Sequence, residues 1–199
     1  MLILDCFYMG KRTLLILTLS FLPLLNLKAE EGSAFSISRA GLVSSFKSQS
    51  LSILCTSDRK ENSFNNFNLT LDTYGLYSNI SNIPGVKLNI VHNSIIDSGH
   101  IDDDFAYIIY MGAGGVAGYV RDYSTLPRNH GFIFGLNTCA GALASFRGSR
   151  LEMGIEFDAE WAFQIRKMEE TDGRLGLSWY ANGVLRALFP KITLYYRFK

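Results

Sequence analysis

The sequence predicts an all-β protein, an eight-stranded antiparallel up-and-down transmembrane β-barrel with a filled lumen. Three observations lead to this prediction: long strands that alternate apolar and polar residues, an export signal at the N-terminus, and an aromatic residue beside the C-terminus. The composition agrees with it. Of the 199 residues, 48% are hydrophobic and only 19% are charged, whereas about a quarter are charged in ordinary soluble domains.

Residues 1–29 are predicted to be a signal peptide. A basic segment that begins at Met9 precedes the apolar run Thr13–Leu27, and Ala29 offers a cleavage site. The apolar run is short for a membrane-spanning helix, which needs about twenty residues, and a proline interrupts it. The residues before Met9 do not belong to this pattern, so we expect Met9 to be the true start. Residues 30–199 are predicted to form an outer-membrane barrel.

The segment Arg150–Lys167 shows the alternation most clearly. Every second residue from Leu151 to Ile165 is apolar, and most residues between them are polar or charged. A period of two is that of a β-strand. The run is longer than the five or six residues of a typical strand, and it exceeds the about nine to eleven that a tilted strand needs to cross a bilayer. From this segment alone, a long half-buried strand of a soluble protein is equally compatible.

Turn signals divide the rest of the chain. Asn82–Gly85 contains a proline, Asp97–His100 and Ser124–Gly131 are predicted to be loops, and Phe146–Arg150 is predicted to be a tight hairpin. Glu169–Pro190 is the one long break, with a partly helical stretch from Leu177 to Phe189. The predicted strands are Phe35–Val43, Lys47–Thr56, Asn65–Tyr77, Val86–Ile96, Asp104–Val120, Gly131–Phe146, Arg150–Arg166 and Lys191–Phe198. In the first, Arg39 falls on the face of Phe35 and Ile37.

The C-terminal strand ends in Tyr195-Tyr196-Arg197-Phe198-Lys199. This ending, with Trp179–Arg186 and the glycine-rich Tyr110–Tyr119, resembles small Gram-negative outer-membrane barrels of the Bacteroidetes type, with OmpA/OmpX-like architecture. Phe198 is penultimate rather than terminal, which departs slightly from that pattern. The resemblance implies the cell outer membrane as location, outer-membrane lipid and the barrel assembly machinery as partners, and Tyr196 and Phe198 as the assembly signal.

Alternation places four acids of one strand inside the lumen, where they would repel one another unless cations neutralise them. Three basic residues also face inward by alternation. The strand from Arg150 should neighbour the terminal strand, so we predict that Arg197 neutralises Glu152. The predicted lumen ion network comprises Glu152, Glu156, Asp158, Glu160, Lys87, Lys191 and Arg197. A proton or cation path is the alternative. On the outer face, Trp161 and Phe163 are predicted to join an aromatic girdle.

The sequence gives little support for a nucleotide cofactor, a metal site, a disulfide or nucleic-acid binding. Gly112–Ala117 matches G-x-G-x-x-A, but strand rather than helix follows, so no nucleotide cofactor is expected and these glycines should face inward to make room. The three histidines form no metal-ligand spacing. Cys55 and Cys139 lie on opposite faces, which predicts two free buried thiols. A formal net charge of +1 gives no reason to expect nucleic acid as a partner.

The predicted function is a structural or surface-interaction barrel whose ligand the sequence leaves unknown, and an enzyme is the less favoured class. One alternative is an outer-membrane lipid-modifying enzyme similar to a lipid A deacylase, with catalysis by His92, His100 or His130 and a nearby serine. Another is a secreted lipocalin-like barrel, which would turn its acids to water and its hydrophobic residues towards a ligand.

Overall fold

The structure is a computed structural model of the chain, and it describes residues 39–45, 50–60, 62–73, 84–122, 130–167, 174–185, 187 and 189–198. The signal peptide predicted for residues 1–29 lies outside this part. The elements are β1 (Arg39–Ser45), β2 (Ser50–Lys60), β3 (Ser63–Asp72), β4 (Gly85–Asp102), β5 (Phe105–Arg121), β6 (His130–Phe146), β7 (Leu151–Lys167), β8 (Leu175–Trp179), α2 (Ala181–Leu185) and β9 (Lys191–Arg197).

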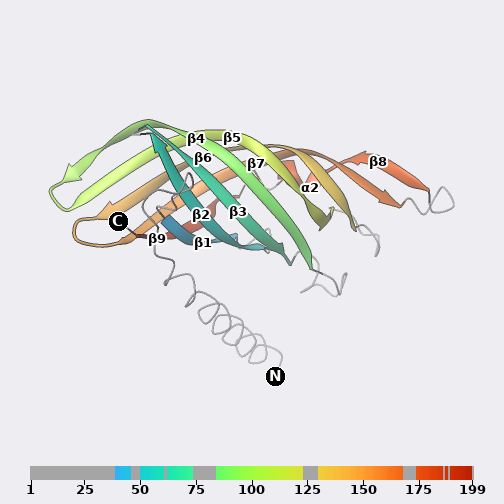
Figure 1. The fold of residues 1–199 in the computed structure, drawn as a ribbon, viewed down its shortest axis with the longest axis horizontal. Helices are drawn as coiled ribbons and strands as arrows, with labels where there is room; N and C mark the ends of the chain where they lie inside the picture. The colour runs from blue at the N-terminus through green and yellow to red at the C-terminus, as the bar shows by residue number, and fades with distance from the viewer. Residues whose placement is uncertain are drawn as a thin grey trace, which may run out of the picture. The chain divides into compact units, whose positions relative to one another are not determined.

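Strands β1 to β7 pair with their sequence neighbours in antiparallel fashion, and β9 pairs with both β7 and β1 (Figure 1). These eight strands therefore form a closed up-and-down barrel, which confirms the prediction of an all-β, eight-stranded antiparallel barrel. Closure matters because it leaves no continuous open edge of unpaired backbone groups. One end of the barrel carries the turns at residues 60–63, 102–105 and 146–151, and we call it the short-turn end; the opposite end is the loop end.

The ninth strand, β8, uses the same edge of β7 as β9 does. β9 pairs with residues 151–156 of β7, and β8 pairs with residues 163–167. Between these two ladders, the six residues 157–162 of β7 span the same distance as the eleven residues 180–190. The eighth barrel strand is therefore interrupted by an insertion that contains α2. β8 is not predicted from the sequence, because residues 169–190 contain turn and helix signals together.

Backbone groups near the insertion have specific partners. The Tyr180 amide donates to the carbonyl oxygen of Ala162 at 2.9 Å, so the open edge of β7 is partly used. The carboxylate of Asp122, at the end of β5, accepts hydrogen bonds from the Ala181 and Asn182 amides at 3.3 and 2.8 Å. A side-chain acceptor at the start of a helix satisfies donors that the helix itself leaves unpaired. Asp122 thereby fixes where α2 begins.

The two faces of the barrel have opposite polarity. On β7, the apolar positions Leu151, Phe157, Trp161 and Ile165 are exposed on the outside, while the acids are buried in the interior. The same alternation runs through β3 to β6 and β9. It follows from the strand period of two, because a fixed register assigns alternate residues to one face. The predicted faces of β7 are thus confirmed, and the interior is filled with side chains.

Glycines on β5 let β4 approach closely. Gly112, Gly114 and Gly118 lie on the inner face, as predicted, and a Cβ on Gly114 would collide with the backbone of β4 at the Ile90 carbonyl and at Val91 Cα, 2.6 Å away. Gly115 points outward instead, and its Cβ would meet only the Gly135 carbonyl oxygen at 3.9 Å. A larger side chain would therefore not fit at the inward-facing glycines of β5, whereas it would fit at Gly115.

Of two turns predicted from the sequence, one is confirmed by the structure and the other is wrong. The hairpin predicted at Phe146–Arg150 is confirmed, and Gly148 adopts a φ of 74°, which favours glycine. The loop predicted at Asp97–His100 is wrong, because these residues continue β4 and pair with β5. Register shifts at Ile95/Asp97 and His100/Asp102 mark bulges, which admit turn-forming residues into a paired strand.

Substitution of the two neighbouring glycines tests the inner packing. We expect Gly114→Ala to lower the free energy of unfolding by about 1–3 kcal/mol, because the methyl group overpacks against β4. Gly115→Ala should change it by less than about 1 kcal/mol, because its methyl group enters open space. Denaturant titration followed by tryptophan fluorescence measures both. Equal effects of the two substitutions would contradict the assignment of faces on β5.

Candidate functional site: the lumen ion network

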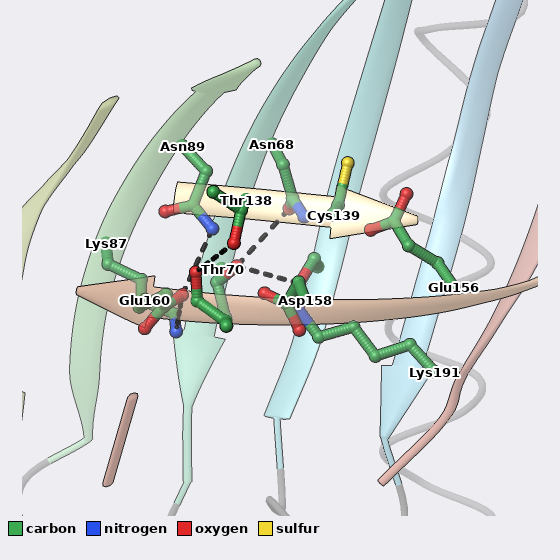
Figure 2. Close-up of polar contacts among 12 residues, drawn as sticks. Asn68, Thr70, Lys87, Asn89, Thr138, Cys139, Glu156, Asp158, Glu160 and Lys191 are labelled. Atoms are coloured by element: carbon green, nitrogen blue, oxygen red, sulfur yellow. Dashed lines mark hydrogen bonds and ion pairs between the residues drawn. The ribbon is translucent and has the colours of Figure 1, made fainter. Parts of the chain in front are cut away.

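The centre of the lumen holds two ion pairs, one between strands on different sides of the barrel and one between the neighbouring strands β7 and β9. Lys87 and Asn89 of β4 both bind Oε1 of Glu160 on β7; the Asn89 amide nitrogen lies 3.2 Å from it (Figure 2). Lys191, at the start of β9, contacts Asp158 at 2.5 Å. All four charged side chains are buried. β4 and β7 are not adjacent strands, so the Lys87–Glu160 pair joins two sides of the closed sheet.

A third acidic residue, Glu152, lies near the short-turn end. Arg39 Nε is 3.0 Å from Glu152 Oε2, and Arg197 Nη1 is 3.5 Å from Glu152 Oε1. The predicted contact of Arg197 with Glu152 is therefore present, but it is the outer part of a triad. The side chain of Arg39 is 10% exposed and that of Arg197 is 43% exposed. Arg39 is thus the buried counter-charge, a role that the sequence analysis did not assign to it.

Glu156 has a different environment from the other acids. The hydroxyl of Tyr110 donates to Glu156 Oε2 at 2.8 Å, and Tyr110 itself packs against Phe64 with ring centroids 5.1 Å apart. Nearby, the Cys139 thiol lies 3.1 Å from Asn93 Oδ1. Glu156 therefore stands where the charged part of the lumen meets an apolar cluster, and a tyrosine hydroxyl satisfies one of its oxygens.

Apolar clusters lie on either side of the central ion pairs. One contains Tyr110, Leu143 and Tyr195, on the side of the short-turn end, and the other contains Ala162 and Tyr180, towards the loop end. Along β7 the order is Glu152, then Glu156 beside the first cluster, then Asp158 and Glu160, then Ala162 in the second cluster. The two central ion pairs are therefore enclosed between apolar layers, which is unlike the continuous polar lining of a water-filled pore.

Neutral polar side chains fill the interior along β2 and β3, across the barrel from β7. The hydroxyl oxygens of Ser52 and Thr70 are 2.8 Å apart. The Thr70 hydroxyl donates to Asn68 Oδ1 at 3.3 Å, and the Thr56 hydroxyl donates to Asn66 Oδ1 at 2.9 Å. These residues lie on β2 and β3 and face inward. Burial of hydroxyl and amide groups costs free energy unless they are hydrogen-bonded. Here two of the bonds join β2 to β3 and the third lies within β3.

The aromatic residues on the outer face gather near both ends. Towards the loop end, Trp161, Phe163 and Trp179 contact one another, with centroid distances of 6.4 Å for the two tryptophans and 5.5 Å for Phe163 with Trp179. Towards the short-turn end, Tyr196 packs on Phe198 at 5.7 Å. Trp179 joins the first group through β8, and because no strand is predicted there, its place in the girdle could not be read from the sequence.

Cys55 and Cys139 are both free and lie on opposite faces, which agrees with the expectation of no disulfide. Cys139 is buried in the lumen, as predicted. Cys55 is only half-buried, on the outer face with Leu51 and Ile53, so the prediction of two buried thiols is wrong for Cys55. The alternation had already placed Cys55 beside outward residues, and the error was to equate an apolar face with a buried one.

The histidines do not meet in one place. His92 faces outward and its Nδ1 lies 2.8 Å from Asn65 Oδ1, while Ser94 lies on the same face of β4. His130 stacks on Tyr119 near the loop end, with centroids 5.9 Å apart, and His100 is exposed near the short-turn end. Within the described ranges, no group of three or more histidine, cysteine, aspartate or glutamate side chains could hold a metal ion.

Comparison with known proteins finds no family model and no curated protein that matches this chain. In the part of the chain that the structure describes, no helix is long and apolar enough to cross a membrane. The assignment of function therefore depends on the geometry of the barrel itself.

The Glu152 triad provides a stability test. We expect Arg39→Met to lower the free energy of unfolding by about 3–5 kcal/mol, because it leaves a buried carboxylate without its main counter-charge. Arg197→Met should cost no more than about 1 kcal/mol, as for a solvent-exposed pair. Denaturant unfolding measures both variants. Adding Glu152→Gln to Arg39→Met should restore part of the loss, and strictly additive losses would show that Arg39 does not neutralise Glu152.

Proposed function

We propose that this chain is an integral protein of the Gram-negative outer membrane, with a structural or surface-interaction role and no open pore. The observation that carries the proposal is the inverted polarity of the barrel. Large apolar side chains such as Leu136, Met153 and Phe157 are exposed on the outer face, and charged residues such as Lys87 and Glu160 are buried within. An apolar belt of this kind is stable where the surrounding solvent is hydrocarbon.

Closure of the sheet supports the same proposal. In a bilayer, backbone groups have no water to bind, so a sheet must pair with itself all the way round. The β1–β9 and β7–β9 ladders provide this closure. The long strands, of 17 or 18 residues in β4 to β7, exceed the about nine to eleven residues that a tilted crossing needs. Aromatic residues near both ends match the girdles of membrane barrels.

A soluble lipocalin-like protein and a porin-like channel fit the barrel less well. A soluble lipocalin-like protein would place hydrophobic residues around a ligand and acids towards water, which is the reverse of the observed faces. A porin-like channel would need a continuous aqueous lumen, whereas apolar clusters and ion pairs fill this one. Eight strands enclose an interior just wide enough for side chains. A lipid-modifying enzyme would need a serine beside a histidine. Ser94 lies two residues after His92 on the same outer face of β4, and Asn65 binds Nδ1 of His92, so this class is the second candidate.

In the proposed orientation, the short-turn end faces the periplasm, because outer-membrane barrels have short periplasmic turns and longer surface loops. The C-terminal strand with Tyr196 and Phe198 then ends on the periplasmic side, where the barrel assembly machinery would recognise it. Residues 1–29 would act as the signal peptide that exports the chain. The surface ligand or partner would bind at the loop end.

Fractionation and electrophoresis test this assignment directly. After expression in a Gram-negative host, we expect the chain to float with outer-membrane vesicles in a density gradient and to resist extraction by alkaline carbonate. Unheated samples in detergent gels should migrate differently from boiled samples, because a closed barrel stays folded. A chain that remains in the soluble periplasmic fraction would contradict the proposal, and large stable conductance steps in planar bilayers would contradict a filled lumen.

An arginine in the apolar belt tests whether that face meets hydrocarbon. We expect Phe157→Arg to make folding into lipid vesicles less favourable by about 2–4 kcal/mol if the position lies near the bilayer midplane. Asp103→Arg is the matched control, because Asp103 is exposed in the turn at the short-turn end. It should change the free energy by less than about 0.5 kcal/mol. Urea titration of folding into phosphatidylcholine vesicles measures both, and equal effects would place the apolar face outside the membrane.

A further inference from the structure

A polar patch interrupts the apolar belt on the outer face of β3 and β4. It consists of Ser63, Asn65, His92 and Ser94, and we call it the β3–β4 patch. The strand register places Asn65 beside His92 and Ser63 beside Ser94. On β4 the patch lies within the belt rather than at its end, because the exposed Ile90 precedes it and the exposed Ile96 follows it.

The hydrogen bond within the patch leaves a donor and an acceptor available. His92 Nδ1 lies 2.8 Å from Asn65 Oδ1. Because Oδ1 can only accept, Nδ1 carries the hydrogen, and the other nitrogen of a neutral imidazole, Nε2, is an acceptor. Asn65 keeps its Nδ2 group as a donor. Hydrocarbon can satisfy neither group, and unsatisfied polar groups are costly in a bilayer.

We propose that the β3–β4 patch joins two copies of this chain in the membrane. The inference rests on the proposed function, since the patch is unusual only if its surroundings are lipid. A second copy fits because the patch is self-complementary. Asn65 Nδ2 of each copy can donate to His92 Nε2 of the other, which gives two equivalent hydrogen bonds related by a two-fold axis. Such an axis, the commonest symmetry of oligomers, runs along the membrane normal between β3 and β4.

The surroundings of the patch suit close contact between two barrels. Ala113 of β5 is in register with His92, and the small side chains there allow a neighbouring backbone to approach. An open groove of about 510 Å³ adjoins the patch, lined by Leu88, Ile90, Gly115, Ala117, Phe134 and Leu136 among others. The groove lies on β4 to β6, to one side of the patch, so the exposed Ile90 and Ile96 of β4 supply the apolar contacts beside the axis.

Cysteine cross-linking in vesicles tests the dimer. In a Cys55→Ser background, Ser94→Cys retains Asn65 and His92 and places a thiol near the axis. The matched control is Ile155→Cys on β7, which is exposed on the outer face but lies on the far side of the closed strand order. In phosphatidylcholine vesicles under mild oxidation, we expect disulfide-linked dimers to form at least tenfold faster with Ser94→Cys than with Ile155→Cys. Equal rates would overturn the proposal.

A second experiment removes the hydrogen bonds without removing the apolar contacts. We expect the double variant Asn65→Leu/His92→Leu to weaken self-association at least tenfold in sedimentation equilibrium in density-matched detergent. Thr138→Val, which changes an exposed polar residue elsewhere on the outer face, should leave it unchanged. A double variant that associates as well as the parent chain would overturn the inference.

Flotation of the same vesicle samples separates this inference from the proposed function. A chain that inserts into the vesicles but stays monomeric overturns only the dimer. A chain that fails to insert overturns both.

Discussion

Closure of a sheet with two opposite faces is the constraint on which the rest of this structure depends. Because β9 pairs with both β7 and β1, all eight barrel strands must keep one common assignment of faces. A slip of one residue in any register would turn a strand's apolar side chains inward and its charged side chains outward. The inward-facing polar residues are therefore collected in a narrow interior, where they must find their partners among one another. The ion pairs of the lumen are a consequence of this confinement.

The confined charges in turn help to specify the register. Lys87 and Glu160 lie on strands that do not touch, yet they meet across the lumen together with Asn89. Removing one member of such a pair is costly, because the remaining charge stays buried. A shifted β4 or β7 would break several contacts at once. The apolar clusters on either side of the pairs contain no charged residue, so a misaligned strand finds no substitute partner there. Filling of the lumen and selection of the register are thus two results of the same packing.

Most of the fold can be predicted from the periodicity of the strands, because a period of two is a local property that every long strand displays. It gave the eight barrel strands, the faces of β7 and the hairpin at Gly148. Features that depend on pairing between distant segments could not be read in this way. Arg39 conflicted with its apolar neighbours in sequence, and only the β1–β9 register shows that it meets Glu152. Asp97–His100 has the composition of a turn, and its place in β4 depends on the bulged ladder with β5. β8 is short, and its strand character depends on the exposed edge of β7.

The interrupted strand and the central ion pair lie at the same place in the barrel. Residues 157–162 of β7 have no strand partner on one edge, and Glu160 lies in this interval. α2 covers it closely: a Cβ on Gly183 would collide with the Glu160 carbonyl oxygen and lie 2.9 Å from its Cβ. Only a residue without a side chain lets α2 approach so near. In an apolar environment a break in a ladder exposes backbone groups that need partners, and Tyr180 and Asp122 supply some of them. The insertion therefore shields the backbone of Glu160, whose carboxylate binds Lys87. The barrel wall thus has its gap in strand pairing at the level where the ion pair between Lys87 and Glu160 joins its two sides.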